Sequence, residues 1–311
     1  METERRDLKT EDGGVISLRV FEPAMSVTAT VVIGGAMGVP QAYYGPYAQW
    51  LAQQGYRVWT FDYRGHGDSL VHVPRRSLRG FRADLIDWAR DYEAVLLAAR
   101  GEQPLLPLYL VGHSLGAQLP GLFRSHDLVD GLFSIAAGSG YWRENAPQLK
   151  RKVLFFWHVM VPLATRVCGY FPGKRLGMVG NLPAGVIHQW RRWCMHPRYS
   201  AGAEGAEVAQ RYARARFPVL AWSFSDDEMM TLRGTRSLLG LYSAAPQQVQ
   251  VIHPVEVPSR RIGHFGFFRE AMASTLWPRS LRDLRALAAL SGETVPVAAT
   301  TIVQNTDTVA S

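Results

Sequence analysis

Residues 105–116 read Leu-Leu-Pro-Leu-Tyr-Leu-Val-Gly-His-Ser-Leu-Gly and are the most informative segment about the fold. The apolar run 105–111 is typical of a buried β-strand, and the five residues that follow it, 112–116, open a helical pattern. A serine between two glycines at a strand-to-helix turn is held in a strained conformation, and side chains at 112 or 116 would collide with adjacent backbone. The sequence therefore predicts Ser114 as the nucleophile.

The chain around this turn alternates β-rich and helical segments, which favours a mostly parallel sheet flanked by helices. We expect an opening hairpin (6–10 and 15–21), helices at 43–54, 78–100 and 267–290, and strands at 28–33, 56–63, 105–111, 132–137, 217–224 and 249–255. With the hairpin, the predicted sheet has eight strands. The predicted fold class is α/β.

Residues 141–216 interrupt this alternation with Pro, Gly, Trp and Arg among helical fragments, so we expect an inserted helical cap between two parts of the α/β core, 1–140 and 217–290. The tail, 291–311, is polar and threonine-rich and is predicted to be disordered. Residues 140–216 carry thirteen Lys and Arg against three Glu, whereas the whole chain has a net charge of +8. The basic excess is therefore concentrated in the cap.

A serine hydroxyl needs a neighbouring base, and the base needs a carboxylate that fixes its tautomer. Nine histidines compete for this role. We predict His264, because it lies in a glycine-flanked loop between the last strand and the last helix. His253 lies within a strand run, three other histidines lie in the cap, and His66 precedes the serine in a tight loop.

The carboxylate is expected just beyond the strand that follows the cap, where Asp226, Asp227 and Glu228 are consecutive. If Pro218 begins that strand, Asp227 occupies the position that faces the histidine, and Asp226 is the alternative. We expect Glu228 and the remaining aspartate to be solvated loop charges.

Acyl transfer also needs two backbone N–H groups that stabilise an oxyanion. We predict the Leu115 N–H as one donor, because it follows the nucleophile. The second is expected from the loop 34–38, Gly-Gly-Ala-Met-Gly, with Ala36 as the first choice and Met37 as the alternative. The loop lacks the Gly-Lys-Ser/Thr ending of a phosphate-binding loop.

These features resemble the α/β-hydrolase superfamily over residues 10–290. Residues 61–69, Phe-Asp-Tyr-Arg-Gly-His-Gly-Asp-Ser, are similar to its D-x-R-G-x-G-x-S loop. Residues 141–142, 169–174, 190–194, 223–228 and 262–269 resemble uncharacterised bacterial hydrolases related to the serine aminopeptidase and monoacylglycerol-lipase-like branch. The resemblance implies the triad of Ser114, Asp227 and His264. The family's usual His-Gly before the oxyanion residue is replaced here by Gly34-Gly35.

Composition excludes several other classes. No helix-turn-helix or RNP-like element accompanies the positive charge, so no nucleic-acid partner is expected. Cys168 and Cys194 lack zinc-ligand or redox spacing and are expected to be reduced packing thiols, and neither a metal nor an organic cofactor is predicted. The charged start of the chain lacks a secretory h-region, so we expect a cytoplasmic protein. The longest apolar run, 153–165, is too short to cross a bilayer.

The predicted function is hydrolysis of a small-molecule carboxylic ester with a hydrophobic acyl group through an acyl-serine intermediate. The same triad would serve an acyltransferase, thioesterase, amidase or peptidase, and a non-catalytic binding or lipid-surface protein is a third class. Cap aromatics and arginines predict either an apolar pocket with a cationic rim or ordinary packing of the insertion. Residues 150–152, Lys-Arg-Lys, and the apolar run after them favour weak peripheral contact with anionic lipid. The sequence does not predict an oligomeric state.

Overall fold

The computed structural model describes residues 3–178 and 180–290. Its centre is an eight-stranded sheet in the order β1-β2-β4-β3-β5-β6-β9-β10. β1 pairs with β2 and β2 with β4 in antiparallel fashion, and the other pairs of this sheet are parallel. The strands are β1 (Thr3–Lys9), β2 (Val15–Phe21), β3 (Ala29–Gly34), β4 (Tyr56–Phe61), β5 (Leu108–His113), β6 (Gly131–Ile135), β9 (Val219–Phe224) and β10 (Gln247–Ile252). The predicted mostly parallel, eight-stranded α/β sheet is confirmed.

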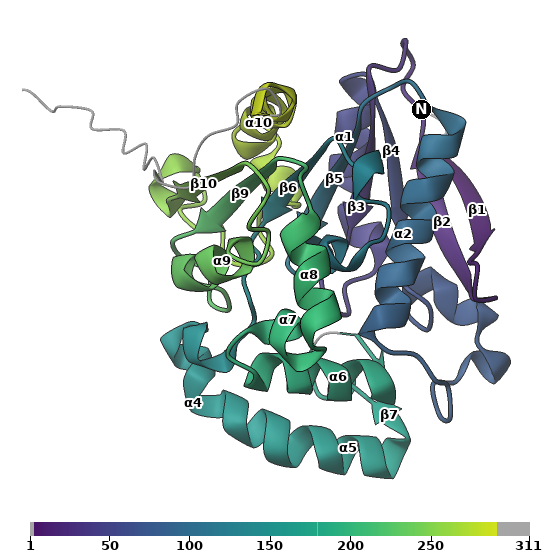
Figure 1. Ribbon diagram of the computed structural model, residues 1–311, viewed down its shortest axis with the longest axis vertical. Helices are drawn as coiled ribbons and strands as arrows, with labels where there is room; N and C mark the ends of the chain where they lie inside the picture. Colours follow the sequence, from purple (N-terminus) through teal and green to yellow (C-terminus); the bar gives the residue numbers. More distant parts are fainter. Residues whose placement is uncertain (1–2, 179, 291–311) are drawn as a thin grey trace, which may run out of the picture.

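Helices cover both faces of this sheet, as Figure 1 shows. α1 (Gly45–Gln53) and α10 (Leu276–Leu290) pack on one face, whereas α2 (Leu85–Glu102), α8 (Ala206–Arg214) and α9 (Leu232–Leu239) pack on the other. Strands β3 to β6 and β9 are buried along their whole length. Continuous burial explains why these strands are apolar runs rather than alternating ones.

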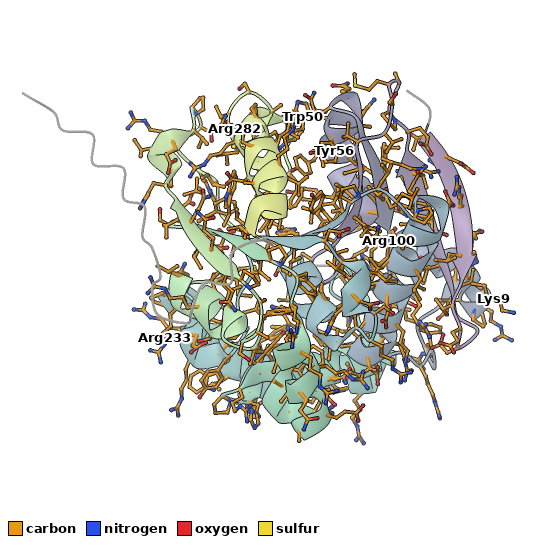
Figure 2. The ribbon with its side chains drawn as sticks, turned by 45° about the horizontal axis from the view of Figure 1, so that its top comes forward. Lys9, Trp50, Tyr56, Arg100, Arg233 and Arg282 are labelled. Carbon is orange, nitrogen blue, oxygen red and sulfur yellow. The ribbon has the colours of Figure 1, made fainter. Side chains whose placement is uncertain are left out.

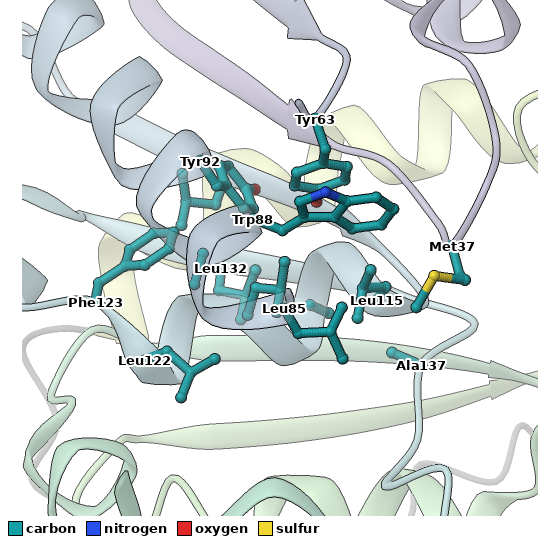
Figure 3. Packing of buried hydrophobic residues seen from close by; sticks show 14 of the residues in the cluster. Met37, Tyr63, Leu85, Trp88, Tyr92, Leu115, Leu122, Phe123, Leu132 and Ala137 are labelled. Atoms are coloured by element: carbon teal, nitrogen blue, oxygen red, sulfur yellow. The ribbon is translucent and has the colours of Figure 1, made fainter. Parts of the chain in front are cut away.

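The core below α2 is built from interlocked aromatic and aliphatic side chains. The ring of Tyr63 stacks on that of Trp88 at a centroid distance of 4.6 Å, and Tyr92 meets Phe123 edge to face at 5.1 Å (Figure 3). Figure 2 shows Lys9 and Arg233 at the periphery of the molecule. The close packing fixes α2 against the sheet.

The segment between β6 and β9 is helical and lies at one end of the molecule (Figure 1). It contains α4 (Pro147–Phe155), a π-helical turn (Phe156–Met160), α5 (Val161–Cys168), α6 (Ala184–Met195), α7 (Tyr199–Ala203) and α8. The two-residue strands β7 (Tyr170–Phe171) and β8 (Leu182–Pro183) pair within it. A helical insertion is thus observed, while its boundaries as a domain at 141 and 216 stay a prediction.

Several predicted bounds were wrong. The helix expected at 78–100 begins only at Leu85, because the Asp84 side chain caps it by accepting from the N–H groups of Ile86 and Asp87. The helix expected at 267–290 begins at Leu276, after a 3₁₀ turn (Glu270–Met272). α9 and the β7–β8 pair were not predicted. The tail 291–311 lies outside the described residues.

Candidate active site

Five loops meet at the carboxyl edge of the parallel strands. They follow β3, β4, β5, β9 and β10 and carry, in that order, Ala36, Asp62, Ser114, Asp227 and His264. In open α/β sheets, ligands bind at this edge of the strands. The topology therefore brings the predicted site residues together from segments far apart in the sequence.

Ser114 occupies a strained turn between β5 and the short helix α3 (Leu115–Gln118). Its φ of 51° and ψ of −108° lie in a region that residues other than glycine rarely adopt. The turn is held by the Ser114 N–H, which donates to the Ile135 carbonyl at 3.0 Å. The predicted need for glycine is also observed: a Cβ at Gly116 would lie 2.0 Å from the Gly34 carbonyl oxygen, and one at Gly112 would lie 2.5 Å from the Ala117 nitrogen.

His264 and Asp227 form a buried pair next to this turn. His264 Nδ1 lies 2.9 Å from Asp227 Oδ2, and both side chains are almost fully buried. The other oxygen of Asp227 accepts from the N–H groups of Met229 and Met230 at 2.7 and 2.8 Å. The carboxylate is therefore fixed by its own loop and holds the imidazole in one orientation, with Nδ1–H as the donor.

The expectation that Glu228 and the remaining aspartate are solvated loop charges was wrong. Both are half-buried, and both hold the loop of His264. Asp226 accepts from the N–H groups of Ile262 and Gly263 at 2.8 and 3.1 Å, and Glu228 accepts from the His264 N–H at 3.1 Å. The carboxylates satisfy backbone donors of a tight loop that has no regular secondary structure to pair with.

A buried chain of hydrogen bonds joins three of the site loops, and sequence reasoning missed its two central side chains. The Ala36 N–H donates to the Tyr44 hydroxyl at 2.7 Å, which lies 2.9 Å from His113 Nδ1. His113 Nε2 lies 2.9 Å from the His264 carbonyl oxygen. No local pattern marks Tyr44, and His113 stands at the variable position of the Gly-x-Ser-x-Gly motif.

The protonation state of His113 determines which group donates and which accepts in each of these hydrogen bonds. Complete burial, with the nearby His264, holds the pKa of His113 well below its usual range, so its imidazole is neutral and has one N–H. A carbonyl oxygen only accepts, so the N–H is on Nε2 and Nδ1 accepts from the Tyr44 hydroxyl. The Tyr44 oxygen is then the acceptor for Ala36, and every member of the chain is satisfied.

The same chain of hydrogen bonds affects which backbone N–H groups are available as oxyanion donors. Since the Ala36 N–H already donates to Tyr44, it has an internal acceptor in this conformation. Among the described residues, no acceptor is found for the N–H of Met37, or for that of Leu115 at the first position of α3. Figure 3 shows the Met37 and Leu115 side chains at the same end of the core. The alternative predicted from sequence, Met37, thus has the unpaired donor.

His264 and Ser114 belong to neighbouring loops, although no hydrogen bond between their side chains occurs among the described residues. The His264 ring centroid lies 5.2 Å from that of His113, the residue before Ser114. Hydrogen bonds between base and nucleophile are often long in free enzymes and tighten only when substrate binds.

The loop that resembles D-x-R-G-x-G-x-S has a structural role. Asp62 accepts from the N–H groups of Gln41 and Asp68, both at 2.8 Å, and the Ser69 hydroxyl donates to the Asp62 carbonyl at 2.6 Å. A Cβ at Gly67 would lie 2.2 Å from the Asp62 carboxyl. These contacts tie the loop after β4 to the segment that follows the predicted oxyanion loop.

The cap aromatics mostly pack the insertion onto the core. Trp157, Phe171 and Trp193 are buried in the main core cluster, and Trp157 meets Trp190 edge to face at 5.2 Å. The cap histidines lie apart from Ser114: His188 pairs with Thr165, and His158 with Arg191. A surface hollow of about 620 Å³, lined in part by Arg211 and Phe217, lies near the amino ends of β6 and β9, the edge opposite Ser114.

Within residues 3–178 and 180–290, no three His, Cys, Asp or Glu side chains gather as metal ligands. In the same part of the chain, no helix has both the length and the apolar character that crossing a bilayer requires.

Comparison with known proteins agrees with this geometry. Residues 26–167 match the model of a family described as serine aminopeptidase, S33. The chain has the α/β-hydrolase fold, and this match covers a little under half of it. The chain is also 30% identical, over 113 residues, to an uncharacterized abhydrolase domain-containing protein of Dictyostelium discoideum. That match spans 36% of this chain and only 11% of the relative's length.

Solved structures share the α/β-hydrolase fold at low identity. A thermostable carboxyl esterase of Bacillus coagulans aligns with a TM-score of 0.65 and 12% identity, over 93% of this chain and 99% of that one. A monoglyceride lipase of Saccharomyces cerevisiae aligns with a TM-score of 0.59 and 16% identity, over 81% and 85%. The expected resemblance and fold are confirmed, and the matched family supports a serine hydrolase.

Proposed function

We propose that this α/β-hydrolase cleaves small-molecule carboxylic esters through an acyl intermediate on Ser114, with His264 as base and acid and Asp227 as the residue that orients it. The observation that carries the proposal is the buried Asp227–His264 pair, 2.9 Å long, beside a serine held at a φ of 51°. A carboxylate-oriented imidazole next to a strained serine has the parts that acyl transfer requires.

The reaction runs in two halves. Ser114 Oγ attacks the ester carbonyl carbon while His264 Nε2 removes the hydroxyl proton. The oxygen that becomes negative accepts hydrogen bonds from the N–H groups of Leu115 and Met37. Collapse of this intermediate breaks the bond to the alcohol, which takes the proton from His264. Water then attacks the acyl carbon while His264 Nε2 takes a proton from it. Collapse of the second intermediate breaks the bond between the acyl carbon and Ser114 Oγ, His264 returns its proton to Oγ, and the carboxylic acid leaves.

Met37 is proposed as the second donor because the Ala36 N–H is held by Tyr44. Losing one oxyanion donor typically raises the activation barrier by about 2.7–4 kcal/mol. The available N–H of Met37 therefore supplies this stabilisation in place of the expected Ala36 N–H. In this proposal Ala36 positions its loop through Tyr44 rather than binding the oxyanion.

A hydrophobic acyl group is proposed because the residues around the site are apolar. Met37, Leu115 and Ala137 are all buried members of the core cluster at this end of the sheet (Figure 3). The same triad would also pass the acyl group to an alcohol, thiol or amine, and no feature of the described residues favours one of these acceptors over water. The cytoplasmic location expected from the sequence stays a prediction.

The experiment is a panel of p-nitrophenyl esters of increasing acyl length, assayed with the wild-type chain, Ser114→Ala and Ser134→Ala. Ser134 is a matched control because it is a buried serine on the neighbouring strand β6. Ser114→Ala is expected to lose essentially all turnover, while Ser134→Ala retains it. Equal activity of Ser114→Ala and wild type would reject the proposal. Repeating the assay with added alcohols or amines measures how much acyl group is transferred to them rather than to water.

A further inference from the structure

The outermost helix of the cap carries two apolar rows on opposite sides. α4, the π-helical turn and α5 follow each other without a break from Pro147 to Cys168. One row, spaced by four residues, is buried against the cap: Val153, Trp157 and Val161, followed by the buried but polar Thr165. The other row has the same spacing and is exposed: Phe155, Val159, Leu163 and Val167.

The two rows are offset by two residues, which places them about 200° apart on a helix. A surface helix normally presents polar residues on the side opposite its buried face. Here Phe155, Leu163 and Val167 are 58%, 61% and 64% exposed, and Leu154 beside them is 41% exposed. Single exposed apolar residues are ordinary, but a continuous row of them marks a contact surface. We call Leu154 and the exposed row the outer stripe.

The outer stripe faces away from the body of the protein. Figure 1 shows α4 and α5 along the edge of the molecule, with α6 between them and the helices that contact the sheet. Residues 3–178 and 180–290 leave the outer stripe uncovered, so a surface other than these residues must bury it.

The charges around the outer stripe indicate which kind of surface covers it. Residues 145–203 contain nine Lys and Arg and no Asp or Glu. Arg151 and Lys152 are exposed at the amino end of the outer stripe, Arg166 is exposed at its carboxyl end, and Lys174 and Arg175 are exposed in the loop beyond β7. An apolar strip flanked by cations, without acidic residues, is complementary to a surface that is apolar inside and anionic at its boundary.

We propose that the outer stripe and its flanking cations dock the protein on anionic phospholipid bilayers. Phe155, Val159, Leu163 and Val167 enter the boundary between headgroups and acyl chains, and Arg151, Lys152 and Arg166 contact lipid phosphates. A second copy of this chain would bring the same cations against each other, so like-charge repulsion disfavours a symmetric dimer through this face. The docking does not depend on the chemistry at Ser114.

The test is co-sedimentation of the full chain with phosphatidylcholine vesicles, with and without phosphatidylglycerol. Binding is expected only to the vesicles that contain phosphatidylglycerol, and it should weaken as salt rises because the cation contacts are screened. Phe155→Ser/Leu163→Ser tests the apolar contact, and Arg151→Glu/Lys152→Glu tests the charge. Each is expected to weaken binding at least about tenfold.

Matched controls make the same changes elsewhere. Leu97→Ser/Leu105→Ser alters two leucines that are 48% and 94% exposed, and Arg282→Glu/Arg285→Glu reverses two exposed arginines of α10. Both controls should bind like wild type. All variants should hydrolyse a water-soluble p-nitrophenyl ester at the wild-type rate, which separates a failure of docking from a failure of the proposed chemistry and from misfolding.

Three results would overturn the proposal. One is no binding to phosphatidylglycerol vesicles at low salt. Another is control variants that lose binding as much as the outer-stripe variants do. The third is a wild-type dimer in sedimentation velocity that Phe155→Ser/Leu163→Ser converts to a monomer, which would assign the outer stripe to an interface between copies.

Discussion

Three consecutive carboxylates, Asp226, Asp227 and Glu228, have three different partners. Asp227 accepts from the His264 ring, while Asp226 and Glu228 accept from the backbone of the loop that carries that ring. Sequence spacing favoured Asp227 but could not distinguish the other two from solvated charges. Their partners come from a loop 36 residues further along the chain, so no local pattern records them.

The first prediction compares two of these aspartates. Asp227→Asn should lower kcat by about 10³–10⁴-fold, because an amide at this position no longer stabilises the Nδ1–H tautomer of His264 or the imidazolium that forms. Asp226→Asn should have a much smaller effect, since it alters only the support of the loop. Steady-state kinetics on one p-nitrophenyl ester measure both. A larger loss in Asp226→Asn than in Asp227→Asn would show that the acid is assigned to the wrong residue.

The second prediction concerns the oxyanion donors. In a crystal structure of the chain phosphonylated at Ser114, the phosphonyl oxygen should lie about 2.7–3.1 Å from the nitrogens of Leu115 and Met37. The hydrogen bond between Ala36 and Tyr44 should persist. An oxygen bound by the Ala36 N–H, with the Tyr44 hydroxyl released, would instead restore the donor that the sequence first suggested.

At the scale of elements, strands were predicted better than helices. β2 was predicted with its observed bounds, and the other strands to within a few residues, because a buried strand is a short apolar run between turn residues. The start of α2 was placed too early, although Asp84 and Asp87 form a recognisable capping box. The start of α10 was harder to predict, because the aromatic residues at 267 and 268 continue the apolar pattern of the helix. They lie in a loop instead, where the Phe267 carbonyl accepts from the Trp277 indole.

The third prediction tests the packing of the turn that carries Ser114. Gly116→Ala should destabilise the fold by about 1–3 kcal/mol and remove activity, because the new Cβ would meet the Gly34 carbonyl, which must move together with the oxyanion loop. Gly101→Ala is the matched control, since a Cβ there meets nothing within 4 Å and the residue lies in α2. Urea unfolding and ester turnover measure both effects.

Gly101→Ala should be neutral or stabilise by up to about 1 kcal/mol, as alanine does within a helix. Wild-type stability and turnover in Gly116→Ala would show that the turn at Ser114 tolerates a side chain that the structure excludes.

At the scale of the whole molecule, buried ionisable groups couple stability to pH in opposite directions. Burial lowers the pKa of His66 to about 4, and it raises the pKa values of Asp62 and Asp91 to about 6. A histidine whose folded pKa is lowered binds protons more readily when unfolded, so its contribution to stability is present above pH 6.5 and is lost as pH falls toward 4. The two carboxyls contribute in the reverse sense over pH 4 to 6.

The fourth prediction isolates His66 from the carboxyls. Between pH 7.5 and 4.5, the free energy of unfolding of the wild type should fall by about 2–3 kcal/mol more than that of His66→Gln, because the carboxyl contributions are common to both chains and cancel. Denaturant unfolding at the two pH values measures this difference. The same pH dependence in both proteins would mean that His66 is not held neutral in the folded state.

The parts of the molecule that the sequence left open are those that depend on contacts between distant segments. The mostly parallel sheet follows from local apolar runs that alternate with helical segments, whereas the order of its strands was not predicted. The hydrogen-bond chain through Tyr44 and His113 includes a bond between residues 151 positions apart. The outer stripe becomes recognisable only once the opposite row of α4 and α5 is known to be buried. Neither feature could be predicted without the folded structure.

Acylation of Ser114 is the central claim, and rapid-mixing kinetics with intact-protein mass spectrometry test it most directly. On mixing with excess p-nitrophenyl ester, the wild type should release one equivalent of p-nitrophenol in a burst and gain the mass of one acyl group on the peptide that contains Ser114. Ser114→Ala should show neither, while Ser134→Ala shows both. A burst and an acyl adduct that persist in Ser114→Ala would contradict the account.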